Sequence, residues 1–290
     1  ASLLDEATAA AEAMAMVCKG KKNPEFLIAE DAFPQTISVI STRAKHLNIN
    51  IKLVNPLQPT VSENSCALFV QSPNRYGSLL NLEEIQSTAT THKLATICAS
   101  DPLSLTLIKP PAEYGFDVCV GSTQRLGLPM GFGGPHAGFI ATTKAYSRKL
   151  PGRIIGATID KFGNKAYRMA LQTREQHIRK EKATSNICTA QALLAIISGF
   201  YGVYHGPKGL TQIAATIHEK TSMIAANIEK FDVKLKNKTY FDTITLEFKN
   251  NSTRESLIKK CEQHLINLNT LDKRYISLSI NECTTELEIQ

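Results

Sequence analysis

Cys66-Ala-Leu-Phe-Val-Gln71 is an apolar run, and a polar segment over 82–90 separates it from a second one, Leu94-Ala-Thr-Ile-Cys-Ala99. These three segments together decide the fold class. Each apolar run has the length and composition of a buried strand. The polar segment between them predicts a helix. Since parallel strands need a crossover between them, usually a helix, this order indicates a unit of parallel β-sheet.

The same alternation continues on both sides of this unit. The apolar runs and the intervening polar segments predict strands over 26–30, 51–54, 117–121 and 138–142, and a helix over 35–46. Short apolar strands alternating with helices are typical of a mostly parallel sheet covered on both faces. We therefore predict an α/β large domain over residues 1–207.

The two ends of the chain follow other patterns. Ser2 and Asp5 form an S-x-x-D capping box, which predicts a helix over 2–19. Apolar periodicity predicts helices over 186–204 and 208–230, and the stretch Gly202 to Gly209, which contains Gly206-Pro207, is the best candidate hinge. The order β-β-α-β from residue 231 predicts a partial small α+β domain, so the second unit, with its connecting helix, spans 208–290.

Composition excludes several classes of protein. The chain has 290 residues, of which 43% are hydrophobic and 20% charged, as in ordinary globular proteins. No apolar run reaches the roughly 18 residues of a membrane span. The seven cysteines are scattered without a CxxC pair, so we expect neither a disulfide framework nor a metal site. A reducing compartment fits this cysteine usage best.

The net charge of +7 is concentrated in one segment. Between Lys144 and Lys182 the chain carries eleven basic and three acidic residues, whereas the rest sums to −1. Two interpretations stay open: a solvated face, or a surface that attracts acidic partners. No motif or interleaved aromatic pattern for nucleic acid accompanies the segment.

The densest glycine cluster is Gly131-Phe-Gly-Gly-Pro-His-Ala-Gly138. It is not a dinucleotide fingerprint, because His136 occupies the last glycine position and a strand follows where a helix is required. The cluster predicts a tight turn with positive φ. A backbone approach to a ligand or to a neighbouring subunit is the alternative.

A second, very polar cluster runs from Gln172 to Thr189. Its basic side chains could hold a carboxylate, since the guanidinium fork suits planar anions. Thr184, Ser185 and Asn186 look like the N-cap of the helix that follows. A solvated loop that ends in a helix cap is the alternative interpretation.

Three segments carry a resemblance to a known family. They run from Ser2 to Met14, from Gly121 to Gly138 and from Gln172 to Gln191. In the same order, they resemble motifs of the glycine cleavage system P-protein family. That family decarboxylates glycine with pyridoxal phosphate (PLP) and passes the aminomethyl group to the lipoyl arm of an H-protein. The resemblance implies an aminotransferase-like, PLP-dependent fold type I.

The resemblance also implies that this chain is a fragment. Family members are roughly three times as long and consist of two homologous halves, fused or separate, and this chain is similar to part of the N-terminal half. The Schiff-base lysine belongs to the C-terminal half, and Gln124 stands at the corresponding place here. Asp101 sits near the place of the acid that pairs the pyridine nitrogen. We therefore expect no covalently bound PLP and no activity in this chain alone.

The family's active site lies between the halves, so this half can contribute residues to it. The candidates at the interface and on the substrate side are Arg174, His177, Arg179, Lys182, Ser185, Asn186, Gly133, Gly134 and His136. Cys188 is either a redox-sensitive thiol or a buried helix cysteine. The implied partners are the C-terminal half, the H-protein and glycine, in a mitochondrial matrix or a bacterial cytoplasm. An inert structural or regulatory homologue and a stand-alone PLP aminotransferase or decarboxylase are the alternatives.

Overall fold

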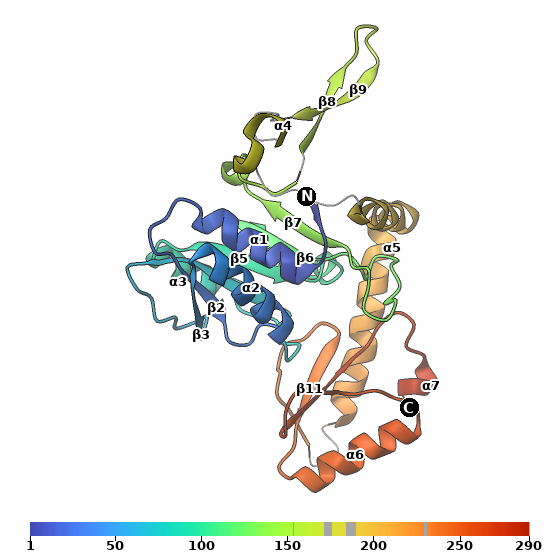
Figure 1. The fold of residues 1–290 in the computed structure, drawn as a ribbon. Coiled ribbons are helices and arrows are strands. Elements are labelled where there is room, and N and C mark those ends of the chain that lie inside the picture. The colour runs from blue at the N-terminus through green and yellow to red at the C-terminus, as the bar shows by residue number, and fades with distance from the viewer. Residues whose placement is uncertain (153, 171–175, 184–189, 229–230, 232, 290) are drawn as a thin grey trace.

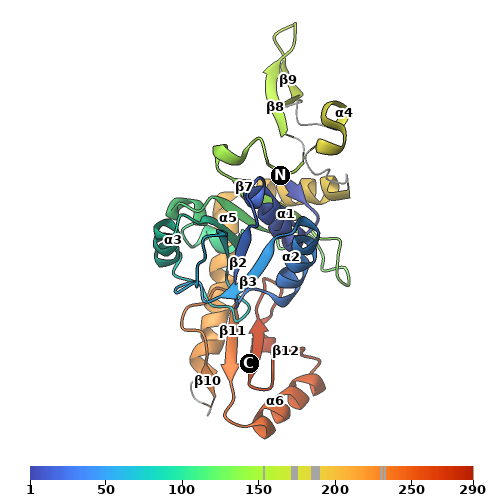
Figure 2. The same cartoon turned by 60° about the vertical axis from the view of Figure 1, so that its left-hand side comes forward.

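A seven-stranded sheet, a four-stranded sheet and a separate two-stranded hairpin organise the chain (Figure 1). The computed structural model describes residues 1–152, 154–170, 176–183, 190–228, 231 and 233–289. The hairpin projects from one end of the molecule, and the four-stranded sheet lies at the other end. Figure 2, turned by 60°, shows the same arrangement.

The large sheet has the strand order β1-β7-β6-β5-β4-β2-β3. Its strands are β1 (Ser2–Leu3), β2 (Glu25–Ala29), β3 (Asn50–Val54), β4 (Ser65–Ser72), β5 (Ala95–Ser100), β6 (Val118–Ser122) and β7 (Gly138–Thr142). Every pair from β3 to β6 is parallel, and β7 and β1 add an antiparallel edge. The predicted mostly parallel α/β sheet is confirmed.

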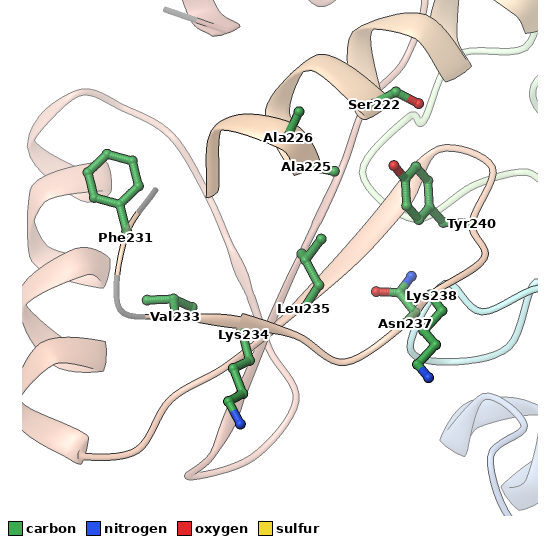
Figure 3. A pocket seen from close by; sticks show the side chains of 10 residues that line it. All are labelled: Ser222, Ala225, Ala226, Phe231, Val233, Lys234, Leu235, Asn237, Lys238 and Tyr240. Atoms are coloured by element: carbon green, nitrogen blue, oxygen red, sulfur yellow. The ribbon is translucent and has the colours of Figure 1, made fainter. Parts of the chain in front are cut away.

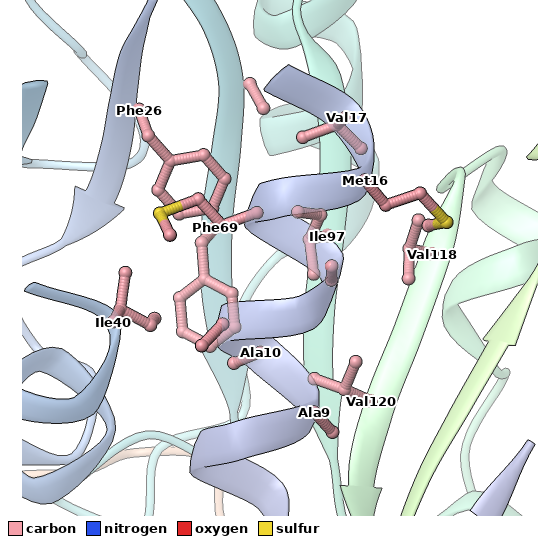
Figure 4. Close-up of a cluster of buried hydrophobic side chains, with 14 of the residues drawn as sticks. Ala9, Ala10, Met16, Val17, Phe26, Ile40, Phe69, Ile97, Val118 and Val120 are labelled. Carbon is pink, nitrogen blue, oxygen red and sulfur yellow. The ribbon is translucent and has the colours of Figure 1, made fainter. Parts of the chain in front are cut away.

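Helices cover both faces of this sheet. They are α1 (Glu6–Cys18), α2 (Pro34–Leu47) and α3 (Leu82–Thr91). The helices α1 and α2 pack on one face in a core that includes Phe26, Phe69 and Ile97 (Figure 4). The helix α3 packs on the other face. Five of the six alanines of α1 are buried, and their small side chains let this helix approach the sheet closely.

The N-terminal helix begins later than the sequence predicts. Ser2 and Leu3 form the edge strand β1, paired with β7. Asp5 is the N-cap of α1: its Oδ1 accepts a hydrogen bond from the Thr8 amide at 2.7 Å, and Thr8 Oγ1 accepts one from the Asp5 amide at 3.1 Å. The capping box therefore joins Asp5 to Thr8, and the prediction that Ser2 starts it is wrong. The available sheet edge at β7 explains the difference.

The hairpin of β8 (Ile154–Ile159) and β9 (Lys165–Ala170) was not expected from the sequence. The side chains of β8 alternate between half-buried and exposed, and those of β9 are a mixture of the two, so neither strand is a buried apolar run. A turn over 160–164 joins them, in which Asp160 Oδ1 accepts hydrogen bonds from the Phe162 and Asn164 amides. A prediction based on buried strands misses a hairpin of this kind.

The long helix α5 (Ala190–Ile228) connects the large sheet to the small one. Its backbone leaves the helical conformation at Gly206 (φ 61°, ψ 177°), immediately before Pro207. The two helices predicted for this region therefore meet at a kink. Leu103, Ala214, Ile217 and Phe241 form a buried cluster that joins the second half of α5 to both parts of the chain.

The small sheet is antiparallel, with the strand order β10-β11-β13-β12. Its strands are β10 (Lys234–Leu235), β11 (Thr243–Glu247), β12 (Asn269–Thr270) and β13 (Tyr275–Ser279), accompanied by the helices α6 (Asn251–Gln263) and α7 (Glu286–Ile289). The predicted order β-β-α-β is present, with β12 as an additional edge strand. The first strand of that order, expected from residue 231, is present as only two residues, which pair with β11.

Within the described part of the chain, no helix is both long and apolar enough to cross a membrane.

Candidate functional site

A polar cavity of about 420 Å³ lies where three central strands of the large sheet end. The carboxyl ends of β4, β5 and β6 contribute Gln71, Ser100 and Ser122 to its wall. On the other side lie Asp242, just before β11, and Ser277 of β13. Parallel α/β sheets bind ligands at this edge, beyond the carboxyl ends of the strands. The topology therefore makes this cavity the first candidate for a functional site.

An ion-paired triad crosses the cavity from one sheet to the other. Asp101 directly follows β5, and its Oδ2 lies 3.2 Å from Arg125 Nε. Arg125 Nη2 also donates to Asp242 Oδ2, from the residue before β11. The Arg125 guanidinium lies 5.6 Å from the ring centroid of Phe241. One arginine thus bridges two acids that are 141 positions apart in the sequence.

Burial and charge set the protonation of this triad. Burial raises the pKa of Asp101, and the Asp242 carboxylate raises it further, while Arg125 acts in the opposite direction. For Arg125 burial acts to lower the pKa, but Asp101 and Asp242 together outweigh it and raise the pKa above its usual value. The arginine therefore stays cationic and compensates the negative charge at this edge of the sheet.

Gln124 lies beside Arg125 on the cavity wall, and its amide is engaged on both sides. Its Oε1 is 3.0 Å from His136 Nδ1, and its Nε2 donates to the Pro129 carbonyl at 3.2 Å. The side chain thereby connects the end of β6 to the glycine cluster. Gln124 and His136, two residues singled out from the sequence, are brought together by this contact.

The glycine cluster forms the predicted turn with positive φ. Gly131, Gly133 and Gly134 have φ values of 54°, 108° and 141°. A Cβ atom at Gly131 would lie 2.6 Å from the Gly134 carbonyl oxygen, so the turn has no room for a side chain there. The prediction of a tight turn is confirmed. Gly133 is exposed, and a Cβ at that position would meet no neighbouring atom within 4 Å.

Glu6 forms a second polar group on the cavity wall. Its Oε1 accepts hydrogen bonds from Gln71 Nε2 at 2.8 Å and from Thr36 Oγ1 at 3.1 Å. Burial raises the pKa of Glu6, although both hydrogen bonds act to lower it. The first turn of α1 therefore places a carboxyl group that is held more readily in its neutral form.

The second polar cluster lies elsewhere. His177 and Arg179 belong to α4 (Gln176–Arg179), which is exposed and lies beside the β8–β9 hairpin, with the large sheet between it and the small sheet (Figures 1 and 2). The structure does not bring these two residues to Asp101. Only the backbone of Lys182 is described, in the turn Lys180–Lys182. The remaining candidates lie outside the described residues: Arg174, Ser185, Asn186 and Cys188.

Sequence reasoning found Asp101 and Gln124 but missed Glu6, Arg125 and Asp242. Arg125 directly follows Gln124 and could have been considered as a partner of Asp101 on that ground. Glu6 is concealed within an ordinary helix start. Nothing local marks Asp242, because its role depends on the approach of the small sheet. Among the described residues, no group of three His, Cys, Asp or Glu side chains could hold a metal ion.

A larger hollow, of about 720 Å³, lies between the end of α5 and β10 (Figure 3). Its charged lining residues are Lys234 and Lys238, and the other described side chains around it carry no acid to pair with them. None of its lining residues belongs to the parallel strands of the large sheet. We therefore treat the cavity with the Asp101–Arg125–Asp242 triad as the candidate site.

An apolar face is exposed near the candidate site. It consists of Leu193, Ile196, Phe200, Val203 and Tyr204 on α5, and we call it the apolar α5 face. Met130 and Phe132 of the glycine turn are exposed as well. The turn segment and α5 are close, because a Cβ atom at Gly127 would meet the Tyr201 ring. Contiguous exposed apolar side chains of this kind mark interaction surfaces.

The mostly parallel sheet with an antiparallel edge, the acid after β5 and the small sheet that closes the cavity define the PLP-dependent fold type I class. Solved structures support this assignment. A C-DES mutant with glycine covalently linked to its PLP cofactor matches 99% of this chain and 78% of its own, with TM-score 0.66 and 15% identity. The Burkholderia pseudomallei sphingosine-1-phosphate lyase matches with TM-score 0.68 and 12% identity, over 100% of this chain and 67% of its own. At these identities the likeness shows the fold alone.

The chain belongs to the glycine cleavage system P-protein family, whose sequence model matches residues 1–290. A crystal structure of glycine decarboxylase (P-protein), in inhibitor-bound form, matches with TM-score 0.89 and 31% identity, over 99% of this chain and 68% of its own. The glycine dehydrogenase (decarboxylating) of Nostoc punctiforme is 46% identical over 288 residues. The Flaveria trinervia protein named glycine dehydrogenase (decarboxylating), mitochondrial, is 46% identical over 290 residues.

The chain is shorter than these relatives. The matches cover 98% of this chain in both cases, but only 29% of the Nostoc punctiforme protein and 28% of the Flaveria trinervia protein. The chain therefore spans about three tenths of the length of the curated relatives that it matches.

The residues on the cavity wall do not fit covalently bound PLP. An enzyme of this class holds PLP through a lysine imine and pairs an acid with the pyridine nitrogen. No lysine is among the described residues that line the cavity, and Asp101 is already paired with Arg125. A carboxamide such as Gln124 cannot form an imine with an aldehyde.

Proposed function

We propose that this chain is part of the N-terminal half of a P-protein that decarboxylates glycine with PLP and passes the aminomethyl group to the lipoyl arm of an H-protein. In this proposal the chain supplies a half that does not anchor the cofactor. The observation that carries it is that Gln124 lines the cavity. In this proposal Gln124 stands at the position that corresponds to the Schiff-base lysine, as the sequence resemblance implies.

The surroundings of Gln124 support this role. Its amide holds the glycine turn through His136 and the Pro129 carbonyl, so it acts as a structural link. Asp101, the acid that would have to pair with the pyridine nitrogen of a cofactor, is already paired with Arg125. In this proposal the cofactor and its lysine belong to the other half of the protein. This half contributes residues to the shared site at the interface but does not bind the cofactor covalently.

The apolar α5 face supports a contact with that other half. Its five side chains lie on the first part of α5, and the exposed glycine turn adjoins them. Burying such a face gains free energy in proportion to the apolar area removed from water. We propose that the C-terminal half covers it, which would bring the interface candidates Gly133, Gly134 and His136 toward the shared site.

The second polar cluster completes the proposal. In this proposal its side chains bind anionic groups at the interface, and the glycine carboxylate is the first such group. The candidates are Arg174, His177, Arg179, Lys182, Ser185 and Asn186. Cys188 stays a candidate thiol in the same segment. The compartment follows the organism in this proposal, a mitochondrial matrix or a bacterial cytoplasm.

Complementation tests the proposed function. The chain is mixed with a separately produced C-terminal half, and exchange between glycine and bicarbonate is measured. We expect exchange from the mixture and none from this chain alone, with no PLP fixed to this chain by borohydride. If the C-terminal half alone catalysed exchange as fast as the mixture does, the result would instead favour an inert homologue. Borohydride-stable PLP on the chain alone would contradict the proposed absence of an anchor.

A further inference from the structure

Two buried cysteines face each other away from the candidate site. Cys18 is the last residue of α1, and Cys66 is the second residue of β4. Their Sγ atoms are 2.9 Å apart, which is about 0.9 Å more than the roughly 2.0 Å of a disulfide bond. Their exposed fractions are 4% and 1%. The two elements are far apart in the sequence, so this contact is a feature of the folded core.

We propose that Cys18 and Cys66 form a reversible disulfide when the protein meets a hydroperoxide, and that this thiol pair is a redox-modification site. The contact is the only one between two thiols recorded within the described residues. Forming the bond requires the two sulfurs to approach by about 0.9 Å.

The environment of the pair gives its two members different roles. The pKa of Cys66 is lowered because its sulfur accepts a hydrogen bond from Cys18 and because the Lys21 ammonium is nearby. Lys21 Nζ also donates to the Cys66 carbonyl at 3.4 Å. The pKa of Cys18 is raised by the same hydrogen bond and by burial. Cys66 is therefore the better nucleophile, and Cys18 retains its proton until the second step.

A small oxidant can reach this place. Cys18 lines a hollow of about 560 Å³, together with Lys19, Lys21, Arg43 and Lys149. Lys19, Lys21 and Lys149 of this lining stabilise negative charge that develops on a departing oxygen, whereas Arg43 is paired with Glu12 in the same hollow. Cys18 therefore lies at the wall of a cavity, and the Cys66 sulfur lies 2.9 Å behind the Cys18 sulfur.

The chemistry balances with hydrogen peroxide as the oxidant. The Cys66 thiolate attacks one peroxide oxygen, the O–O bond breaks, and the departing hydroxide takes a proton and leaves as water. Cys18 then loses its proton and attacks the Cys66 sulfenic sulfur, and the S–O bond breaks to release a second water. Two thiols and one peroxide give one disulfide and two waters. A dithiol reductant reverses the change by thiol–disulfide exchange.

The bond would connect the end of α1 to the start of β4. It would close a loop of about 50 residues, and a native disulfide of that span stabilises the folded state. Glu6 at the other end of α1 and Gln71 at the other end of β4 both line the candidate site. Oxidation therefore fixes the two elements whose far ends are joined by the hydrogen bond from Gln71 to Glu6.

The test uses the full chain treated with a small excess of hydrogen peroxide, with free thiols then blocked. Peptide mapping should show residues 18 and 66 joined by a disulfide, with an intact mass lower by about 2 Da before blocking. Dithiothreitol should restore both thiols. The melting temperature should rise by several degrees on oxidation and return on reduction.

Other cysteines of the chain provide matched controls. Cys98 and Cys119 are register partners on β5 and β6, and we expect both to remain thiols under the same treatment. Cys283 is exposed and its oxidation should leave the melting temperature unchanged. A Cys66→Ser variant should lose the shift in melting temperature. Unjoined residues 18 and 66 in the wild-type peptide map, or a Cys98–Cys119 bond in their place, would overturn the proposal even if the variant failed to fold.

Discussion

Arg125 is the residue on which the candidate site depends, because it compensates two acids that belong to different sheets. Arg125→Met leaves Asp101 and Asp242 without their shared cation. Removing one partner of a fully buried ion pair costs about 3–5 kcal/mol. Since the Arg125 side chain keeps 24% of its exposure, we expect a loss of roughly 2–3 kcal/mol in the free energy of unfolding.

Urea unfolding measures this effect, with Arg148→Met as a control at an exposed arginine. The control should change stability by less than about 0.5 kcal/mol. Arg125→Lys should recover part of the loss, because lysine keeps the charge but cannot engage both acids with a planar fork. Equal stability of Arg125→Met and the wild type would show that the triad does not hold the two sheets together.

Glu6 gives a pH-dependent prediction. Because burial raises its pKa in the folded state, the folded chain binds a proton more readily than the unfolded chain does. The wild type should therefore lose stability, relative to Glu6→Gln, as the pH rises from the unfolded pKa of about 4.3 through the folded pKa. Glutamine keeps an oxygen that can accept from Thr36 and Gln71.

The comparison requires unfolding curves of both proteins at several pH values. At low pH the two should be nearly equal in stability, and above the folded pKa Glu6→Gln should be the more stable protein. A difference that stays constant across the whole range would mean that Glu6 does not titrate in the folded chain.

At the scale of elements, the start of α1 shows how tertiary context selects between two local signals. Asp5 and Thr8 cap each other's backbone amides, whereas Ser2 lies in an edge strand. Asp5→Ala should cost about 1 kcal/mol, the usual value for a lost N-cap. Ser2→Ala, at an exposed position, should cost almost nothing. Chemical denaturation of the two variants separates these outcomes, and a larger effect at Ser2 would restore the earlier helix start.

The elements that the sequence predicts correctly are those with a strong local signal. β4 and β5 are buried runs bounded by polar residues, and they lie within a residue of the predicted positions. The β8–β9 hairpin has no buried run, because its strand residues are exposed or only half-buried. β1 is only two residues long and exists because β7 offers it an edge. Local patterns cannot supply that information.

The candidate site shows the same division between local and distant information. Asp101 and Gln124 could be found because the resemblance to the family marks their positions. The triad could not be found, since it requires residue 242 to approach residues 101 and 125 across two sheets. His177 and Arg179 were candidates because they lie in the polar cluster from Gln172 to Thr189. The structure places them beside the hairpin and not at the cavity.

At the scale of the whole molecule, the apolar α5 face predicts how this chain joins the rest of its protein. Phe200→Asp introduces a charge at a side chain that is 70% exposed here and covered in the proposed assembly. We expect at least a tenfold weaker association with the C-terminal half, because burying an unpaired charge at an interface costs about 2 kcal/mol or more. Met223→Asp, at an exposed position on the second part of α5, is the control.

Association is measured by titration of one half with the other, and both variants should unfold at the same temperature as the wild-type chain alone. If Met223→Asp weakened binding as much as Phe200→Asp did, the interface would not be confined to the first part of α5.

The charge of the chain becomes a prediction about the carrier protein. The excess of positive charge lies in the segment from Lys144 to Lys182, which includes the exposed Lys161, Lys165 and Arg168 of the projecting hairpin. If this surface attracts an acidic lipoyl carrier, raising the salt concentration from 50 to 300 mM should slow association by roughly tenfold, because screening shortens the reach of exposed charges.

Substitutions in the same segment test the prediction at single positions. Arg148→Ala with Lys149→Ala should slow association several-fold at low salt, and Arg153, outside the described residues, is a third position to replace. Lys208→Ala, an exposed lysine outside the segment, should have little effect. Association rates in a complete enzyme decide the question: rates that do not depend on salt would identify the segment as a solvated face, because a docking surface of this charge cannot escape screening.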